Sequence, residues 1–555
     1  MHAARLALVC SLSVFTACTE TPGADGGVTG AGGGVTGAGG GAQGTGGGGP
    51  VVGGPVRFTM GTDNFPFENY TNTPGIVNLT EVEMVRLFGD GVCAGPADGG
   101  TCTLTPSADN FMQSTNAAMN GGHCEGMAVL SVFFATGQAN PSDFGAATGN
   151  ALTLMGNEKL QREIAYWWAT QSTNPTQAAD SRGKLTPTEV LALIERSFTV
   201  GGESYAFGMY KRDGSGGHAN TPYAVREVDA GIKEVLVYEN NFPMAITAVT
   251  IDTMSNTWSY NATPNPTTPA ELYEGDATTK SLTVTPNSAR TQRQVCSTCG
   301  EVNADGRGVK GNAVSFRTVR LQGDAALRIV DGQGNTIALD GGSYVSSIPG
   351  ATLIATRFAP STWDDREVPA FQLPLTTPLT ITLDGSGMTA ATEAAVRLTA
   401  PGYTFAVEGV GLEPGQVDTI AFSAGSDSVR YTTSGPETPI VELGLTLDGS
   451  DYLFEVASGS EANGVTVELR ADVPGQRLGV RITSMDGMAS YGVRVHVLNA
   501  DDVVFAHQGN AISATAIVWL QYGTWAGDGT PMSFGIDDDG DGTIDQTVMV
   551  SDDGN

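Results

Sequence analysis

The pattern of apolar and polar residues divides the chain into a helical first part and a long second part with strand periodicity. Between residues 56 and about 200, apolar residues recur at the three- and four-residue spacing of amphipathic helices. Further on, short β-branched and aromatic runs alternate with turn residues. The pattern predicts a multidomain protein in which an α+β domain precedes all-β sandwich-like modules.

Helix signals are strongest at four places. Two helices begin with a capping box, in which threonine is followed three residues later by glutamate, at Thr80/Glu83 and Thr186/Glu189. A third helix, over 158–170, is amphipathic. The fourth begins near Cys124 and is apolar almost all round through Phe134, which predicts a helix buried on most faces.

Strands are predicted in both parts of the chain. In the first domain, which we place at 56–285, they cover 205–210, 219–228, 232–238, 246–251 and 257–260. Farther on they cover 314–321, 326–330, 379–383, 395–398, 403–407, 465–469, 478–482 and 492–497. The regular alternation of short strands and turns in this second group is typical of β-sandwiches and predicts two modules, at 300–400 and 401–555.

The N-terminus has the features of an export signal. Arg5 is followed by an apolar stretch over 6–15 and then by Thr-Ala-Cys18. This segment, 1–18, resembles a bacterial lipoprotein signal, which implies that Cys18 carries a lipid; ordinary secretion with an incidental Cys18 is the alternative. Residues 19–55 are rich in glycine, with alanine, threonine and valine, and this composition predicts a disordered tether. We expect an exported protein that is anchored to a membrane and faces the periplasm or the cell exterior.

The net charge and the cysteine content restrict the partners and the reactions that we expect of this protein. A formal net charge of −31 argues against a nucleic-acid partner, because phosphates require basic residues. In an oxidising compartment, Cys93 with Cys102 and Cys296 with Cys299 are expected to form disulfides. For the second pair, a redox motif and half of a zinc site are the alternatives. Cys124 falls outside both pairs, and a thiol kept reduced in a secreted protein is a hint of function.

Two short motifs predict a nucleophile and its base. Cys124 follows two glycines and opens the buried helix, where the helix dipole favours a thiolate. Gly126 in the first turn allows this helix end to pack tightly. Downstream, His218 also follows two glycines, and the other histidines after the signal segment lie beside the cysteine or far along the chain. His218 is therefore the candidate base.

The order of Cys124, His218 and the pair Asn240-Asn241 resembles the papain-like cysteine peptidase fold over about 200 residues. The resemblance implies that Cys124 attacks a carbonyl, His218 carries the proton, and Asn240 or Asn241 orients the imidazole. A hairpin over 217–238 would bring the residues that follow it, Asn240 and Asn241, close to His218. Glu239 lies at the same place, so the orienting residue is one of these three. The expected partner is a peptide or protein substrate.

The family's oxyanion-hole glutamine precedes its cysteine by a few residues, and this chain departs from that pattern. Asn120 lies four residues before Cys124, and Gln113 lies eleven before it. The Cys-x-Gly and Gly-His motifs also resemble NlpC-type cell-wall peptidases, although His123 replaces the usual aspartate. Acyl transfer would use the same nucleophile. A non-catalytic surface or adhesion protein, with β modules that bind a cell-surface ligand, is the alternative from another class.

An acidic loop near the C-terminus predicts a structural calcium site. Asp537, Asp539, Asp541, Thr543 and Asp545 occupy alternate positions, with glycine at the sixth, as in an EF-hand loop. Position 12 is Val548 instead of glutamate, so the loop resembles the short calcium loops of secreted bacterial proteins. An acidic turn without metal is the alternative. No organic cofactor is expected.

Overall fold

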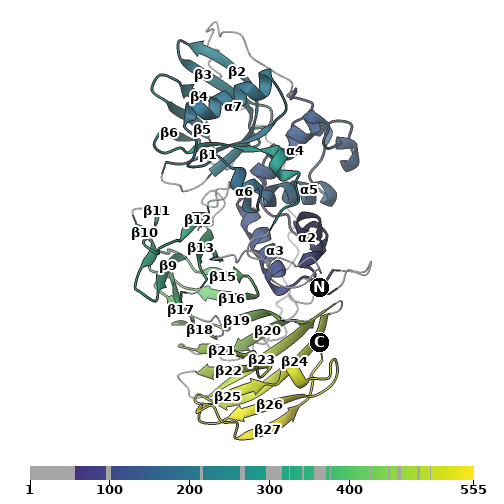
Figure 1. Ribbon diagram of the computed structural model, residues 1–555, viewed down its shortest axis with the longest axis vertical. Coiled ribbons are helices and arrows are strands. Elements are labelled where there is room, and N and C mark those ends of the chain that lie inside the picture. Colours follow the sequence, from purple (N-terminus) through teal and green to yellow (C-terminus); the bar gives the residue numbers. More distant parts are fainter. Residues whose placement is uncertain are drawn as a thin grey trace, which may run out of the picture.

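The structure is a computed structural model. It describes residues 57–95, 102–212, 217–262, 269–295, 316–323, 325–340, 343–354, 370–375, 377–423, 428–447, 450–458, 464–483, 488–499 and 502–554. Over these residues the protein is multidomain and mostly antiparallel β-sheet, with its helices in the N-terminal part. Figure 1 shows the helices and one sheet in the upper half and the longer sheets below. This order of elements is the predicted one.

Local signals fix the helices of the first domain. They are α2 (Glu81–Phe88), α3 (Pro106–Ala118), α4 (Cys124–Thr136), α5 (Glu158–Ala169), α6 (Thr176–Ala179), α7 (Pro187–Thr199) and α8 (Asn287–Arg290). Both predicted capping boxes are present, at the starts of α2 and α7. In α4, every residue from Cys124 to Phe134 is buried, which confirms the predicted buried helix.

A seven-stranded antiparallel sheet completes this domain. Its strands are β1 (Tyr205–Tyr210), β2 (Gly217–Asp229), β3 (Ile232–Tyr238), β4 (Ile246–Asp252), β5 (Thr257–Ala262), β6 (Glu271–Asp276) and β7 (Leu282–Pro286). The order is β6-β5-β4-β3-β2-β1-β7, so β7 crosses back to pair with β1. The first five strands were predicted. The sequence did not indicate β6 and β7.

Helix α4 lies between this sheet and α5. Thr221 on β2 donates a hydrogen bond to the Ala128 carbonyl (2.9 Å), and its hydroxyl lies 2.9 Å from that of Ser131. On the opposite side, a Cβ at Gly126 would overlap the carbonyl oxygen of Ile164 in α5. The predicted close packing at Gly126 is confirmed, and it fixes the position of the α4 N-terminus.

The C-terminal part contains only strands and one short 3₁₀ turn among its described residues. The strands are β8 (Phe316–Gln322), β9 (Ala326–Asp331), β10 (Thr336–Asp340), β11 (Ser343–Ser346), β12 (Thr352–Ile354), β13 (Ala370–Pro374), β14 (Leu379–Asp384), β15 (Thr392–Ala400), β16 (Tyr403–Leu412), β17 (Val417–Phe422), β18 (Ser428–Thr432), β19 (Ile440–Leu447), β20 (Ser450–Ser458), β21 (Thr466–Asp472), β22 (Arg477–Thr483), β23 (Met488–Leu498), β24 (Asp502–Ser513), β25 (Ile517–Leu520), β26 (Met532–Asp537) and β27 (Gln546–Val550).

These strands form two long sheets around one shared core. One sheet has the order β11-β10-β9-β14-β17-β18-β21-β22-β25-β26-β27, and the other has β12-β13-β8-β15-β16-β19-β20-β23-β24. Side chains of both sheets belong to a single hydrophobic cluster. The boundary predicted between 400 and 401 falls in the turn that joins β15 to β16, which pair with each other. The sandwich character is as predicted, but the two modules are not separate, because pairing continues across that turn.

Helix α3 attaches the first domain to the β sheets. Its Asn110 side chain donates to the carbonyls of Phe405 (3.2 Å) and Leu398 (3.4 Å). The Ser107 hydroxyl donates to the carbonyl of Ala400 (3.2 Å). These contacts are buried, so α3 forms a polar joint between the two parts (Figure 1).

The first domain extends beyond its predicted end at residue 285. Gln294 donates its backbone N–H to the Leu87 carbonyl (3.0 Å) and accepts hydrogen bonds from Thr173 (2.9 Å) and Thr176 (3.0 Å). The predicted disulfide between Cys93 and Cys102 is present. Among the residues described, no helix is both long and apolar enough to cross a membrane.

Candidate active site

Cys124 is the first residue of α4. His123 precedes it and provides no side-chain cap for the helix. Gly122 has φ 113°, and a Cβ there would meet the Asn69 side-chain amide. The glycine before His123 therefore allows a backbone conformation and a close approach that other residues would not. The backbone conformation at Gly122 and its contact with Asn69 lead the chain into α4, whose buried N-terminus carries the positive end of the helix dipole next to the Cys124 thiol.

His218 lies one residue into β2, beside this helix end. Its neighbour Ala219 packs against Cys124 and Ala128 in a small buried cluster. The His218 and Cys124 side chains are hydrogen-bonded to each other. The structure thus brings together the two residues that were predicted as nucleophile and base, although 93 residues separate them in the chain.

Glu239 contacts the other side of the imidazole. His218 Nε2 lies 2.6 Å from Glu239 Oε1, which leaves Nδ1 as the ring nitrogen for the thiol. The second carboxylate oxygen accepts hydrogen bonds from Asn220 Nδ2 (3.0 Å) and from the Tyr260 hydroxyl. Of the three residues left open by the sequence, the structure places Glu239 against His218.

The two asparagines have different contacts. The Asn240 side chain donates to the carbonyls of Cys124 (3.2 Å) and Ala219 (2.7 Å), so it connects the backbone at Cys124 to β2. Asn241 donates its backbone N–H to Glu239 Oε1 (3.0 Å). Neither takes the position against the imidazole that the sequence interpretation gave to one of them. Their side chains are shorter than that of Glu239, which follows the last residue of β3 directly.

The electrostatics of this site favour a protonated His218. Burial by itself would lower the pKa of His218, but the Glu239 charge and the hydrogen bonds to Cys124 and Glu239 raise this pKa to about 10. Burial would raise the pKa of Glu239, but the positive charge of His218 and the donated hydrogen bonds lower it. Near neutral pH the geometry therefore favours an imidazolium between a carboxylate and the thiol.

A second network holds the loop before Cys124. Asn69 Oδ1 accepts the His123 backbone N–H (2.7 Å), and the Asn69 N–H donates to the Asn240 carbonyl (2.9 Å). The Tyr70 ring stacks on His123, with 4.2 Å between centroids. Burial lowers the pKa of His123 to about 4, so this imidazole is neutral. Segment 69–70 thus packs on both loops that carry the site, a role that the sequence did not indicate.

Glu125, the residue after Cys124, forms a buried ion pair with Arg290 of α8. Both side chains are fully buried, and the Arg290 guanidinium also donates to the Thr170 hydroxyl (2.7 Å). This pair connects the start of α4 to the last helix of the domain. No local pattern in the sequence marks a contact over 165 residues.

The site is closed. Cys124, His218 and Glu239 are each 1% exposed. A substrate carbonyl can reach the Cys124 sulfur only when residues that cover it move. Gln113, one candidate for the oxyanion hole, donates instead to Asp109 (2.8 Å) and accepts from Arg397 of the β sheets (3.4 Å). Asn120 lies in the 3₁₀ turn Met119–Gly121 just before the glycines.

The acidic loop follows β26. Asp537, Asp539 and Asp541 each present a carboxylate oxygen within 4.8 Å of the others. Asp537 is buried and accepts backbone N–H groups of Gly540 (2.7 Å) and Gly542 (2.9 Å). Asp545 instead accepts the Asp538 N–H (2.9 Å) and is not part of the three-carboxylate group. The Thr543 N–H donates to Asp541 (2.7 Å), which closes the loop.

Other predicted site residues lie outside the described part of the chain. These are the lipidation candidate Cys18 and the pair Cys296 and Cys299. Comparison with known proteins adds nothing to the geometry, since no family model, no curated protein and no solved structure matches this chain.

Proposed function

We propose that the protein is an exported cysteine hydrolase with a papain-like arrangement, in which Cys124 is the nucleophile, His218 the base and acid, and Glu239 the residue that orients the imidazole. The observation that carries the proposal is the buried contact chain from Cys124 through His218 to Glu239. A cysteine and a histidine used only for packing would not need a carboxylate aligned on the far ring nitrogen.

The contacts favour a specific reaction order. With the proton on His218, Cys124 is a thiolate that attacks the substrate carbonyl carbon. His218 then gives its proton to the leaving nitrogen as the amide bond breaks and an acyl-enzyme forms. Water loses a proton to His218, attacks the acyl group and releases the acid. N–H groups of the first turn of α4 are the natural donors for the negative oxygen at each step.

Burial of Cys124 favours a second candidate. In a non-catalytic surface protein, the same residues would be a structural network beneath the helix end, and the β sheets would carry the binding function. The two candidates predict different effects of Cys124→Ser. In a hydrolase this substitution abolishes turnover, whereas in a structural network the hydroxyl replaces the thiol with little change to the fold or to binding.

The experiment incubates the exported chain with a proteome-derived peptide mixture and reads new termini by mass spectrometry. We expect cleavage that falls by roughly 10³-fold or more in Cys124→Ser and His218→Ala. Glu234→Gln, which removes a partly exposed carboxylate on β3 outside the contact chain, is the matched control and should cleave like the wild type. Cleavage that persists in Cys124→Ser, or no cleavage by any variant, would contradict the hydrolase proposal.

Export and anchoring belong to the same proposal. A lipid on Cys18 would hold the folded part near a membrane, with residues 19–55 as spacer, and the sequence pattern supports this. Growth with an alkyne fatty acid should label the wild type and Cys10→Ser, because Cys10 is removed with the signal. Cys18→Ser should lose the label and leave the membrane fraction.

We propose further that the acidic loop binds calcium in a structural role. Three converging carboxylates on a glycine-containing turn supply the oxygen ligands that Ca²⁺ prefers. The loop joins β26 to β27 at the edge of the longer sheet, so a bound ion would hold that edge together.

A further inference from the structure

The side chain of Asn69 lies beside the loop that leads into α4. Asn69 is 4% exposed and belongs to a segment without helix or strand that precedes α2. Its backbone N–H donates to the Asn240 carbonyl (2.9 Å), and its Oδ1 accepts the backbone N–H of His123 (2.7 Å). Asn69 is therefore held between the two loops that carry Cys124 and Glu239.

The hydrogen bonds of Asn69 determine which way its amide is turned. Oδ1 accepts two backbone N–H groups, from His123 (2.7 Å) and from Tyr70 (3.0 Å), so the remaining atom of the amide is the NH₂ group. Nδ2 lies close to Gly122, because a Cβ at that glycine would be 2.8 Å from it. Among the residues that the structure describes, this NH₂ group has no acceptor. A nearly buried donor of this kind is available to an acceptor that arrives with a ligand.

Two other polar side chains near Cys124 cannot supply a donor. The Asn240 amide already donates to the carbonyls of Cys124 and Ala219. His123 donates through Nδ1 to the Tyr70 carbonyl (2.7 Å). Because burial lowers the pKa of His123 to about 4, this ring is neutral and its Nε2 carries no proton.

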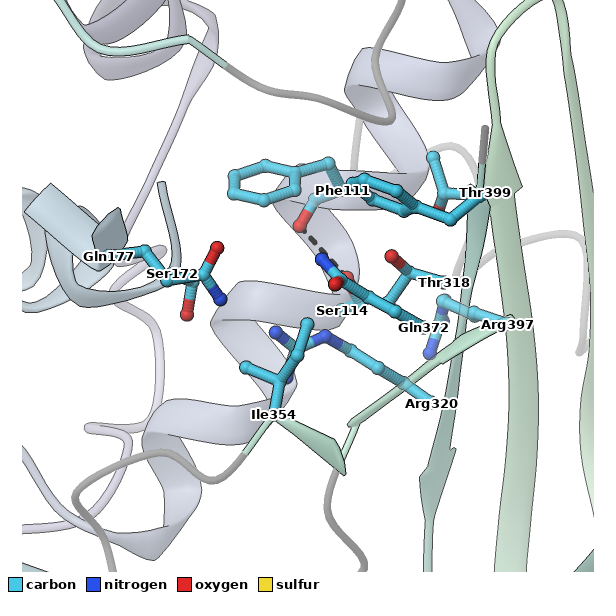
Figure 2. A pocket seen from close by; sticks show the side chains of 11 residues that line it. Phe111, Ser114, Ser172, Gln177, Thr318, Arg320, Ile354, Gln372, Arg397 and Thr399 are labelled. Atoms are coloured by element: carbon cyan, nitrogen blue, oxygen red, sulfur yellow. Dashed lines mark hydrogen bonds between the residues drawn. The ribbon is translucent and has the colours of Figure 1, made fainter. Parts of the chain in front are cut away.

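The glutamine that most closely precedes Cys124 in the chain is also engaged. Gln113 donates to Asp109 and accepts from Arg397. Arg397 lines a small cavity between α3 and the β strands, where Figure 2 shows it together with Ser114 of α3. The Gln113 amide is thus held at the joint between the first domain and the β sheets.

We propose that the Asn69 NH₂ group is an oxyanion donor of the hydrolase, an inference that rests on the function proposed above. When the Cys124 thiolate attacks, a bond forms from sulfur to the carbonyl carbon, and an electron pair of the C=O bond moves onto the oxygen. Asn69 Nδ2 donates a hydrogen bond to that negative oxygen, together with N–H groups at the start of α4. The oxygen returns the pair as the C–N bond breaks and the leaving nitrogen takes the proton of His218. Asn69 keeps both of its amide protons throughout.

The surroundings of Asn69 make such a donor effective. Asn69 and Cys124 are almost completely buried, and a hydrogen bond to a charged oxygen is stronger where water is excluded. The bonds to Asn240 and His123 hold the amide in place before a substrate arrives, so little reorganisation is needed during the reaction. Removing one oxyanion donor lowers kcat by roughly 10²–10³-fold in enzymes of this chemistry.

The test compares hydrolysis with alkylation in Asn69→Asp. This variant keeps the oxygen that accepts the His123 and Tyr70 N–H groups, and it replaces the NH₂ group by a second oxygen. For the peptide that the wild type cleaves fastest, we expect kcat to fall by roughly 10²-fold with KM nearly unchanged. Alkylation of Cys124 by iodoacetamide forms no oxyanion and should keep the wild-type rate. Both rates are compared at their pH-independent maxima, because the new carboxylate can raise the pKa of the thiol.

Two further variants serve as controls. Asn69→Ser also lacks the amide but adds no charge, so its kcat should fall to a similar degree. Asn72→Asp makes the same chemical change farther along the same segment, where the amide donates to the Asn116 carbonyl (2.9 Å). This variant should cleave like the wild type.

The outcomes separate this inference from the hydrolase proposal. Wild-type kcat in Asn69→Asp, beside an inactive Cys124→Ser, overturns the role of Asn69 alone. An alkylation rate that falls as far as kcat overturns that role too, because Asn69 would then act by placing the thiol. A loss in Asn69→Asp that Asn69→Ser does not share assigns the effect to the added charge and has the same consequence. Cleavage that persists in Cys124→Ser, or none by the wild type, overturns the hydrolase proposal and this inference with it.

Discussion

Replacing Glu239 by glutamine should destabilise the first domain in a strongly pH-dependent way. The substitution keeps the shape of the side chain but removes the charge that faces His218 Nε2 at 2.6 Å. It also puts an amide NH₂ where Glu239 now accepts hydrogen bonds from Asn220 (3.0 Å) and Tyr260. Without the carboxylate, burial dominates and His218 loses its proton at neutral pH.

The size of this effect follows from the raised pKa of His218. A group whose pKa is raised on folding contributes stability that is complete below its unfolded value and is lost as pH rises through its folded value. For His218 these values are 6.5 and about 10. At about 1.4 kcal/mol for each tenfold change in proton affinity, the pair contributes about 4 kcal/mol at pH 7. Removing one partner of a buried ion pair typically costs roughly 3–5 kcal/mol, which agrees.

The free energy of unfolding of the wild type and of Glu239→Gln is measured in urea at pH 6, 7, 8 and 9. Pulsed hydrogen exchange of peptides from β2 and β3 serves as the readout, so that only the unfolding of this sheet is followed. The difference between wild type and Glu239→Gln should shrink by about 1.4 kcal/mol per pH unit above pH 6.5. The control is Glu234→Gln, whose partner Arg226 is half-exposed, and it should cost about 1 kcal/mol or less at every pH. A loss from Glu239→Gln that is equally small, or that does not change with pH, would refute the assigned ion pair.

Three further predictions concern other parts of the molecule. Burial raises the pKa of Glu437 to about 7, so wild-type stability should fall as pH rises from about 4.5 through 7; Glu437→Gln should remove that part of the decline in urea unfolding at pH 5 and pH 8. Gly126→Ala should destabilise the domain by about 1–3 kcal/mol, because its methyl group would overlap the Ile164 carbonyl; an unchanged unfolding temperature would contradict the packing of α4 on α5. Chelation of calcium should lower the unfolding temperature of the wild type but not of Asp539→Asn, and an equal response of both would exclude the acidic loop as the metal site.

Features encoded by neighbouring residues were the ones that the sequence predicted well. The capping boxes marked the starts of α2 and α7, since both partners lie within one turn. The bounds of β1 and β3 match the predicted runs because their side chains are mostly apolar and the turns beside them contain glycine or asparagine. Helix α4 was recognised from its continuous apolar surface.

Features that depend on distant packing were missed. Helix α3 has a weak apolar pattern because it contacts the β sheets through polar side chains such as Ser107 and Asn110. The boundary at residues 400 and 401 was placed from the spacing of strands and turns alone. That spacing does not reveal which strands pair, and β15 pairs with β16 and β16 with β19.

The candidate site was predictable as a set of residues but not in its details. Chain order and the hairpin brought Cys124, His218 and the 239–241 segment together. Choosing Glu239 required the positions of Asn220 and Tyr260, which hold the carboxylate toward the imidazole. These contacts lie between strands whose register includes bulges, and the sequence does not specify them.

The most direct test of the proposed chemistry is the alkylation rate of Cys124 by iodoacetamide, measured by mass spectrometry on the folded protein from pH 5 to 9. The account predicts that Cys124 is alkylated faster than the protein unfolds, and that the reaction is already substantial at pH 6, because the His218 imidazolium stabilises a thiolate. In His218→Ala the rate at pH 6 should fall sharply, whereas Glu234→Gln should react like the wild type. Alkylation at the rate of global unfolding, and equally in all three proteins, would contradict a Cys124–His218 pair and leave a structural cysteine.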